Sequence, residues 1–376
     1  MNDQELAIVM SGGGARAAYQ VGFLKCVAEH YPDLEVPIVT GVSAGAINAA
    51  YLADQPGSFR EKVDGLAELW GNLTPEQVFT VEVVPTVMNV LRWGSRLLLG
   101  RASHSIHTRS LLDVSPLRVF IEKALGSDDG RLLGIARNID KGRLKAFAIT
   151  GSSYSTGQSV TWVQGRDIER WNRAHRLGVN CELSLDHILA SASLPLFFPA
   201  VKIDDMWYGD GGMRLTAPLS PAVHLGAERI LAISTRHIPE PGENICVIDG
   251  YPPPAQIVGT LFNSVFLDAF DGDALRLERI NKLLHELPDG RHGILRAVAM
   301  MLLRPSEDLG KLANEYEPQL PTVFRFMERG LGTRETRSND MLSLVMFQSD
   351  YLRRLIELGY DDAEENRAEL HSVVDG

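Results

Sequence analysis

Hydrophobic and polar positions in the first fifty residues follow two regular patterns. Residues 6–10 are a short apolar run of the kind that forms a buried parallel strand, and residues 36–39 repeat it. Between them, residues 18–30 have a helical pattern, with apolar Val21, Leu24 and Val27 at helical spacing. A helix rich in small residues is expected directly after the second strand. This strand–helix–strand–helix order predicts a parallel sheet in an α/β fold.

The pattern continues along the chain and then changes. Strands are expected at residues 144–150, 158–163, 206–208 and 229–235, and a small-residue helix at 185–193. Residues 229–235 are the last segment that is obviously a core strand. A passage rich in proline and glycine, residues 239–254, is the best candidate for a domain boundary. The sequence therefore predicts an α/β domain at residues 1–240 and a mainly helical C-terminal extension at residues 241–376.

A glycine-framed serine lies between the second strand and its helix, in the stretch Gly41-Val42-Ser43-Ala44-Gly45. It has the Gly-x-Ser-x-Gly pattern of a nucleophile elbow, a sharp strand-to-helix turn that holds a serine in strained backbone geometry. Gly41 and Gly45 lack the side chains that would keep strand and helix apart. The simpler alternative is a chance match in a glycine-rich turn, because motifs this short also occur by chance.

A glycine triplet follows the first strand. Gly12, Gly14 and Ala17 match the fingerprint of a dinucleotide-binding turn, which also requires an acidic residue near the end of the second strand. Asp33 and Glu35 precede that strand, so the dinucleotide interpretation fails. Two interpretations remain. Either the backbone N–H groups form an oxyanion hole at a helix N-terminus, or the triplet is simply a tight turn.

A serine nucleophile needs a base that takes its proton. None of the ten histidines stands in a glycine-framed turn, whereas Asp210 follows an expected strand and precedes Gly211 and Gly212. Such a backbone lets an aspartate approach another loop closely, although Asp-Gly pairs are also common in simple turns. The ordinary pKa of an aspartate is about 3.9, so burial would have to raise the pKa of Asp210 for it to act near neutral pH.

Four sequence blocks in this order make the chain similar to the patatin-like phospholipases, acyl hydrolases that use a Ser–Asp dyad. The resemblance spans roughly residues 6–235. The blocks are Gly12-Gly13-Gly14-Ala15-Arg16, Gly41-Val42-Ser43-Ala44-Gly45, Ala190-Ser191-Ala192-Ser193-Leu194-Pro195 with Phe198-Pro199, and Asp210-Gly211-Gly212. The resemblance implies a three-layer α/β/α catalytic domain with a mainly parallel sheet, and it does not cover the helical extension.

By position, the resemblance implies that Ser43 is the nucleophile and Asp210 the base. It places the oxyanion hole at Gly12, Gly13 and Gly14. An ordinary α/β-hydrolase with a Ser-His-Asp triad also carries a Gly-x-Ser-x-Gly turn. That fold is disfavoured, because only one strand precedes the strand that leads into Ser43.

Arg16 follows the glycine triplet directly, and two roles are open to it. Its guanidinium either binds a lipid phosphate of the substrate or braces the loop. One position departs from the family, since Ala17 stands where a glycine is common. This small substitution affects only the expected geometry of the turn.

The function implied by these residues is hydrolysis of lipid carboxyl esters, as in a phospholipase A or lysophospholipase, without a cofactor or metal. Two alternatives are a catalytically silent lipid-binding or scaffold protein, and an esterase or thioesterase with non-lipid substrates. Residues 78–99 are apolar on nearly every side, which is typical of buried core or a dimer contact. A hydrophobic flap for acyl chains is the functional alternative for this segment.

The net charge limits the classes of binding partner, and the cysteine content indicates the cellular compartment. A formal net charge of -11 argues against nucleic acid as the main partner. Three cysteines without a metal-ligand pattern indicate a reducing compartment and no structural metal. No basic segment followed by an apolar run opens the sequence, and no apolar run approaches the ~20 residues that span a bilayer. We therefore expect a cytoplasmic protein with at most peripheral membrane contact, whose oligomeric state the sequence leaves open.

Overall fold

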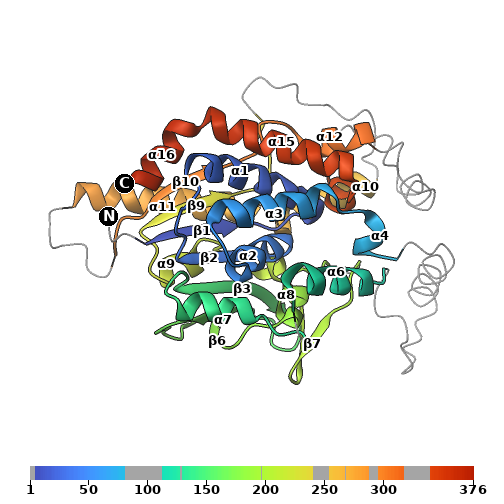
Figure 1. The fold of residues 1–376 in the computed structure, drawn as a ribbon, viewed down its shortest axis with the longest axis horizontal. Helices are drawn as coiled ribbons and strands as arrows, with labels where there is room; N and C mark the ends of the chain where they lie inside the picture. Colours follow the sequence, from blue (N-terminus) through green and yellow to red (C-terminus); the bar gives the residue numbers. More distant parts are fainter. Residues whose placement is uncertain are drawn as a thin grey trace.

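The computed structural model of the chain describes residues 5–80, 112–127, 129–195, 197–239, 254–266, 268–287, 295–316 and 339–376. Within these residues a ten-stranded sheet forms the centre, and helices cover both of its faces (Figure 1). The strands are β1 (Leu6–Met10), β2 (Ile38–Val42), β3 (Ala146–Ser153), β4 (Ser159–Gly165), β5 (Asn172–Arg173), β6 (Arg176–Asn180), β7 (Val201–Ile203), β8 (Met206–Asp210), β9 (Arg229–Ile233) and β10 (Ala299–Leu303).

Helices of very different length connect these strands. The described helices of the first part of the chain are η1 (Gly14–Arg16), α1 (Ala17–His30), α2 (Ala44–Asp54), α3 (Phe59–Gly71), α4 (Pro75–Val78), α6 (Ser115–Leu125), α7 (Leu133–Asp140), α8 (Leu185–Ser191), η2 (Gly211–Arg214) and α9 (Ser220–His224). Those of the later part are α10 (Pro254–Phe266), α11 (Asp268–Glu286), α12 (Leu309–Tyr316), α14 (Asp340–Val345), α15 (Ser349–Glu365) and α16 (Arg367–Asp375).

The sheet is mainly parallel. Its main path runs in the order β10-β9-β1-β2-β3-β4-β6-β5, and the five strands from β10 to β3 are all parallel to their neighbours. Antiparallel pairs join β3 to β4 and β8, β5 to β6, and β7 to β8. The expected three-layer α/β/α fold with a mainly parallel central sheet is confirmed.

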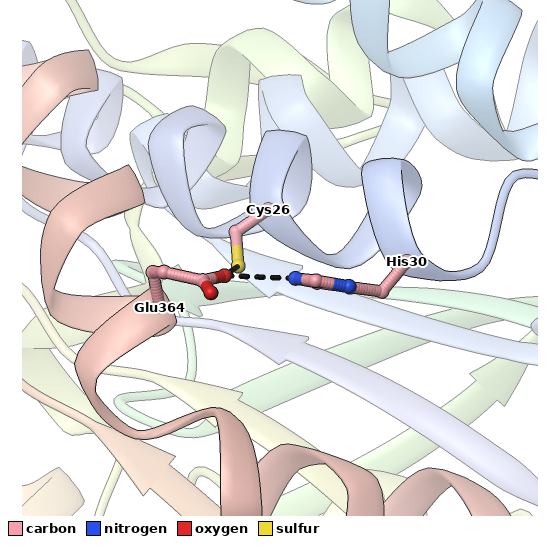
Figure 2. Close-up of side chains that lie close together, drawn as sticks. All are labelled: Cys26, His30 and Glu364. Carbon is pink, nitrogen blue, oxygen red and sulfur yellow. Dashed lines mark hydrogen bonds and ion pairs between the residues drawn. The ribbon is translucent and has the colours of Figure 1, made fainter.

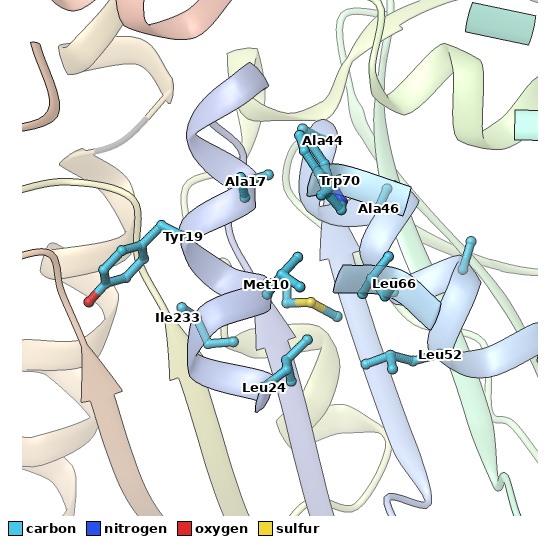
Figure 3. Packing of buried hydrophobic residues seen from close by; sticks show 14 of the residues in the cluster. Met10, Ala17, Tyr19, Leu24, Ala44, Ala46, Leu52, Leu66, Trp70 and Ile233 are labelled. Atoms are coloured by element: carbon cyan, nitrogen blue, oxygen red, sulfur yellow. The ribbon is translucent and has the colours of Figure 1, made fainter. Parts of the chain in front are cut away.

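Side chains of β1 alternate between two hydrophobic cores. Leu6, Ile8 and Met10 pack with α1, α2, α3 and α15 on one face of the sheet, and Figure 3 shows Met10 between α1 and α3. Ala7 and Val9 pack with α9 and α11 on the other face. Because both faces are covered, every residue of β1 is buried, which explains why this strand reads as a continuous apolar run.

Four of the described strands of the sheet were not expected from the sequence: β5, β6, β7 and β10. β10 pairs in parallel with β9, so the core continues beyond residues 229–235, the last core strand that was obvious from the sequence. Residues 299–303 are a short apolar run, and a run of this length does not distinguish a strand from a buried helix by its periodicity. The described C-terminal part is nevertheless mainly helical, as expected.

The C-terminal helices pack directly on the first helix. α15 lies along α1, and the two backbones touch where a Cβ on Gly22 would stand 2.0 Å from the Ile356 carbonyl oxygen. Tyr19 of α1 donates a hydrogen bond of 2.8 Å to Asp362 of α15. The boundary expected between residues 240 and 241 lies outside the described residues and stays a prediction. Across the described part of the chain, no helix combines the length and apolarity that a membrane span needs.

Candidate active site

Ser43 occupies the turn between β2 and α2 in a conformation that is rare for a residue with a side chain, with φ 56° and ψ −132°. Its two flanking glycines make this turn possible. A Cβ on Gly41 would lie 2.4 Å from the Gly45 carbonyl oxygen, and a Cβ on Gly45 would lie 2.3 Å from the Ser11 carbonyl oxygen. The expectation that both glycines allow a close approach of strand and helix is confirmed.

Strand β3 brings the ends of β2 and β8 together. Val42, the last residue of β2, pairs with Thr150 of β3, and Asp210, the last residue of β8, pairs with the next residue, Gly151. The two strands therefore follow one another along the same edge of β3. As a result Ser43 Oγ donates a hydrogen bond of 2.6 Å to Asp210 Oδ2.

Asp210 is fully buried, and its carboxylate has two described hydrogen-bond donors. Ser43 binds Oδ2, and the Gly212 backbone N–H donates to Oδ1 over 2.8 Å. Burial raises the pKa of Asp210 to about 7, although both hydrogen bonds act to lower it. The carboxyl group thus titrates near neutral pH, as a base for a serine hydroxyl requires. Gly211 allows this approach, because a Cβ there would lie 2.0 Å from the Thr150 carbonyl oxygen.

The glycine triplet lies directly against Ser43. A Cβ on Gly12 would stand 2.9 Å from the Ser43 Cβ, and Gly13 and Gly14 have φ values of 144° and 56° that favour glycine. Thr235, which follows β9, donates a hydrogen bond of 2.7 Å to the Gly12 carbonyl oxygen. The sequence-predicted loop and nucleophile are therefore neighbours in space.

Arg16 anchors this loop to the C-terminal part of the chain. Its side chain is 3% exposed and forms an ion pair of 2.7 Å with Asp340 of α14. Arg16 Nε also donates to Ser343 Oγ over 2.7 Å. On the loop itself, a Cβ on Gly14 would lie 2.1 Å from the Leu344 carbonyl oxygen, so α14 closes on the triplet. These contacts favour the bracing role of Arg16 over phosphate binding.

An apolar cavity opens beside Ser43. Among the described lining residues none is charged, and all are apolar, aromatic or glycine except Ser43. The lining comes from both parts of the chain and includes Gly13, Gly14, Ile47, Leu73, Val78, Phe120, Phe198, Phe266, Leu344, Val345 and Phe347. Val78 begins the segment for which a flap was considered; residues 81–99 of that segment lie outside the described residues. The cavity has the chemistry of a site for a hydrocarbon chain.

The sequence profile of the family described as patatin-like phospholipase matches residues 8–223, more than half of the chain. The chain belongs to this family. Its fold is similar to VipD from Legionella pneumophila, with 14% identity, a TM-score of 0.39, and coverage of 99% of this chain and 67% of that chain. It is also similar to human GIVD cytosolic phospholipase A2, with 12% identity, a TM-score of 0.45, and coverage of 99% and 60%.

A third similar structure is the type III effector protein ExoU, found in Pseudomonas aeruginosa, with 14% identity and a TM-score of 0.38. The alignment covers 98% of this chain and 54% of ExoU. The chain thus spans between about half and two thirds of the length of these three chains. No curated protein sequence matches it.

Ser191 is a residue of the candidate site that the sequence reasoning missed. Its hydroxyl accepts a hydrogen bond of 3.0 Å from the Ser43 backbone N–H and donates one of 2.6 Å to the Thr150 carbonyl oxygen. Asp210 is held by the same segment, because its backbone N–H donates to the Ser193 carbonyl oxygen over 3.0 Å. Both serines lie in the third block of the family resemblance, which was the available signal, but no spacing rule linked that block to the turn.

Proposed function

We propose that this patatin-like phospholipase hydrolyses carboxyl esters of lipids, with Ser43 as the nucleophile and Asp210 as the base. The observation that carries the proposal is the 2.6 Å hydrogen bond between Ser43 Oγ and a buried carboxylate at an apolar cavity. A protein that only bound lipid would have no use for a serine in strained geometry beside a base of raised pKa.

In the proposed reaction Asp210 accepts the hydroxyl proton as Ser43 Oγ bonds to the acyl carbonyl carbon. Backbone N–H groups of Gly12, Gly13 and Gly14 stabilise the oxyanion that develops. The carbon–oxygen bond to the alcohol breaks, and Asp210 returns the proton to that alcohol. Water then attacks the acyl-enzyme with Asp210 again as base. The bond between the acyl carbon and Ser43 Oγ breaks, Asp210 returns the proton to Ser43 Oγ, and the fatty acid leaves. Every step uses side chains and backbone of this chain.

The cavity supports an acyl chain as the group next to Ser43. Its uncharged lining does not offer a partner to a phosphate, and Arg16 is held by Asp340. The headgroup of a phospholipid or lysophospholipid would therefore lie outward from the described lining. Phe266, Leu344 and Val345 belong to the extension expected at residues 241–376, and we propose that this extension completes the substrate site.

We further propose that the protein acts in the cytoplasm and reaches its substrate by peripheral contact with lipid. Cys26 and Cys181 are free thiols, consistent with a reducing compartment.

A fluorophosphonate that carries a long alkyl chain tests the proposal, because it labels only an activated serine. We expect labelling of the wild-type protein and none of Ser43→Ala. Absence of labelling in the folded wild-type protein would support the catalytically silent alternative. Mass spectrometry of a mixed lipid extract, incubated with wild type or Ser43→Ala, then identifies the products. Labelling without release of fatty acid from lipids would instead favour a non-lipid esterase or thioesterase.

A further inference from the structure

A second group of reactive side chains lies between α1 and α15, and none of its members lines the cavity beside Ser43. Cys26 and His30 come from α1 and Glu364 from α15, and Figure 2 shows the three side chains converging between the two helices. Glu364 Oε2 is 2.8 Å from His30 Nε2 and 3.5 Å from Cys26 Sγ. The three candidate ligand atoms all lie within 4.8 Å of one another.

We propose that Cys26, His30 and Glu364 bind a thiophilic divalent cation of the zinc class. Cys26 and His30 are four residues apart, so they project from the same face of α1, the spacing by which one helix supplies two metal ligands. Sulfur, imidazole nitrogen and carboxylate oxygen are the three ligand types that zinc takes from proteins.

The distances fit tetrahedral coordination. Zinc bonds of ~2.3 Å to sulfur and ~2.0–2.1 Å to nitrogen or oxygen place the sulfur and oxygen ligands about 3.5 Å apart and the nitrogen and oxygen ligands about 3.3 Å apart. The Cys26–Glu364 distance of 3.5 Å already matches the first value. The His30–Glu364 distance of 2.8 Å needs only a small opening, which the 37% exposed Glu364 side chain can provide.

The carboxylate of Glu364 is also held in the orientation that this site needs. Arg367, one turn along the chain, donates to Glu364 Oε1 over 2.9 Å and leaves Oε2 directed at Cys26 and His30. Hydrogen bonds of this kind orient metal ligands. One thiolate and one carboxylate would balance the charge of a divalent cation, and a water would complete the four ligands on the exposed side.

Without a cation the same atoms make an ordinary polar cluster, in which the Cys26 thiol and the His30 ring both bond to Glu364. Sequence spacing did not reveal the site, because Glu364 lies 338 residues from Cys26. A bound cation would join the helix that follows the glycine loop to the helix that follows α14. It would therefore act on the packing of α1 against α15 and not on the chemistry at Ser43.

Titration with Co²⁺ distinguishes a cation site from a metal-free polar cluster. A cobalt–thiolate bond gives a charge-transfer absorption that cobalt bound to nitrogen or oxygen ligands does not give. The variant Cys181→Ser, Cys246→Ser keeps Cys26 as its sole thiol and serves as the reference protein. We expect one Co²⁺ per chain, the thiolate absorption, tetrahedral visible bands, and displacement of these signals by Zn²⁺. Adding Cys26→Ser to this variant should remove the absorption. If the folded reference protein shows no cobalt–thiolate absorption, the proposal is overturned.

Glu364→Gln provides a second variant that does not disturb a fully buried side chain. We expect it to weaken Zn²⁺ binding in calorimetry by at least ~10–100-fold, the loss typical of removing an orienting partner of a metal ligand. Circular dichroism confirms that each variant is folded. Zinc should raise the melting temperature of the reference protein but not of Cys26→Ser. Unchanged zinc affinity in Glu364→Gln and Cys26→Ser would assign binding to other groups and refute the site, whatever the esterase activity.

Discussion

Arg16 and Asp340 form an ion pair of 2.7 Å although 324 residues separate them in the sequence. The pair joins the glycine loop beside Ser43 to α14, whose last residues line the apolar cavity. This ion pair is therefore one of the contacts that hold the glycine loop against the part of the cavity wall formed by α14. A change at Arg16 should alter both stability and the binding of long acyl chains.

Replacement of Arg16 by methionine should destabilise the protein by about 1.5–3 kcal/mol, because Asp340 and Ser343 lose a charged hydrogen-bond partner. The free energy of unfolding from denaturant titration measures this effect. Arg60→Met is the matched control, since Arg60 forms an exposed pair of 3.8 Å with Asp64 that contributes at most about 1 kcal/mol. Equal losses in the two variants would contradict the bracing role.

Removal of either member of the dyad should abolish ester hydrolysis. We expect Ser43→Ala and Asp210→Asn each to lower kcat by about 10²–10⁴-fold or more, the contribution of a positioned base and its nucleophile. The double variant should be no worse than the poorer single variant, because residues that act as a unit are not additive. Initial rates on a chromogenic ester measure this, and losses that multiply would show that the two residues act separately.

The pH dependence follows from the raised pKa of Asp210. The base must be ionised, so kcat/KM should rise with pH and reach half its maximum near the pKa of about 7. A profile that is already flat from pH 5 upward would show that Asp210 is ionised far below neutral pH. The Asp210→Glu variant should shift the midpoint, whereas a change in substrate concentration should not.

The same pKa predicts the pH dependence of stability. Above an ordinary value of 3.8 the unfolded chain releases the Asp210 proton, while the folded chain keeps it until about pH 7. Stability from this residue therefore falls as pH rises from about 3.8 to 7. Asp210→Asn cannot ionise, so it should melt at a higher temperature than wild type at pH 8. Its free energy of unfolding at that pH should exceed that of wild type by at most about 4 kcal/mol. The gap should close toward pH 4.

Ser191 should act on catalysis through the position of Ser43. Ser191→Ala removes the hydroxyl that accepts from the Ser43 backbone N–H and donates to the Thr150 carbonyl oxygen, at a cost of about 1–3 kcal/mol. We expect kcat to fall about 10-fold or more with little change in KM. Ser193→Ala is the control, because the Ser193 hydroxyl bonds only to the Leu189 carbonyl oxygen within its own turn. A rise in KM with unchanged kcat would contradict the positioning role.

The parts of this site that could be predicted from the sequence are those fixed by local geometry. Gly41 and Gly45 around Ser43 meet a steric requirement of one turn, so the motif itself carries the information. Asp210 was predicted from the strand before it and the two glycines after it, and Gly211 fits closely against the Thr150 carbonyl oxygen. In both cases a missing side chain marks the place where two backbones touch.

Long-range partners left no such mark. The place of β10 beside β9 depends on pairing across the sheet, and its five residues carry no distinctive period. The Arg16–Asp340 pair and the contact of Ser191 with Ser43 join segments that no spacing rule connects. Their geometry appears only when the sheet is assembled.

The packing of α1 beneath α15 also determines the order of events during synthesis. Tyr19 contacts Asp362, which the ribosome adds 343 residues later. At elongation rates of 5–20 residues per second, about 17–70 s pass between the two. During this time the side of α1 that packs on α15 lacks its native partner, and β1 lacks its partner strand β9 until residue 233 has been added. The glycine loop likewise gains its contact with α14 only after residue 340 has been added, so the surroundings of Ser43 are completed late in synthesis.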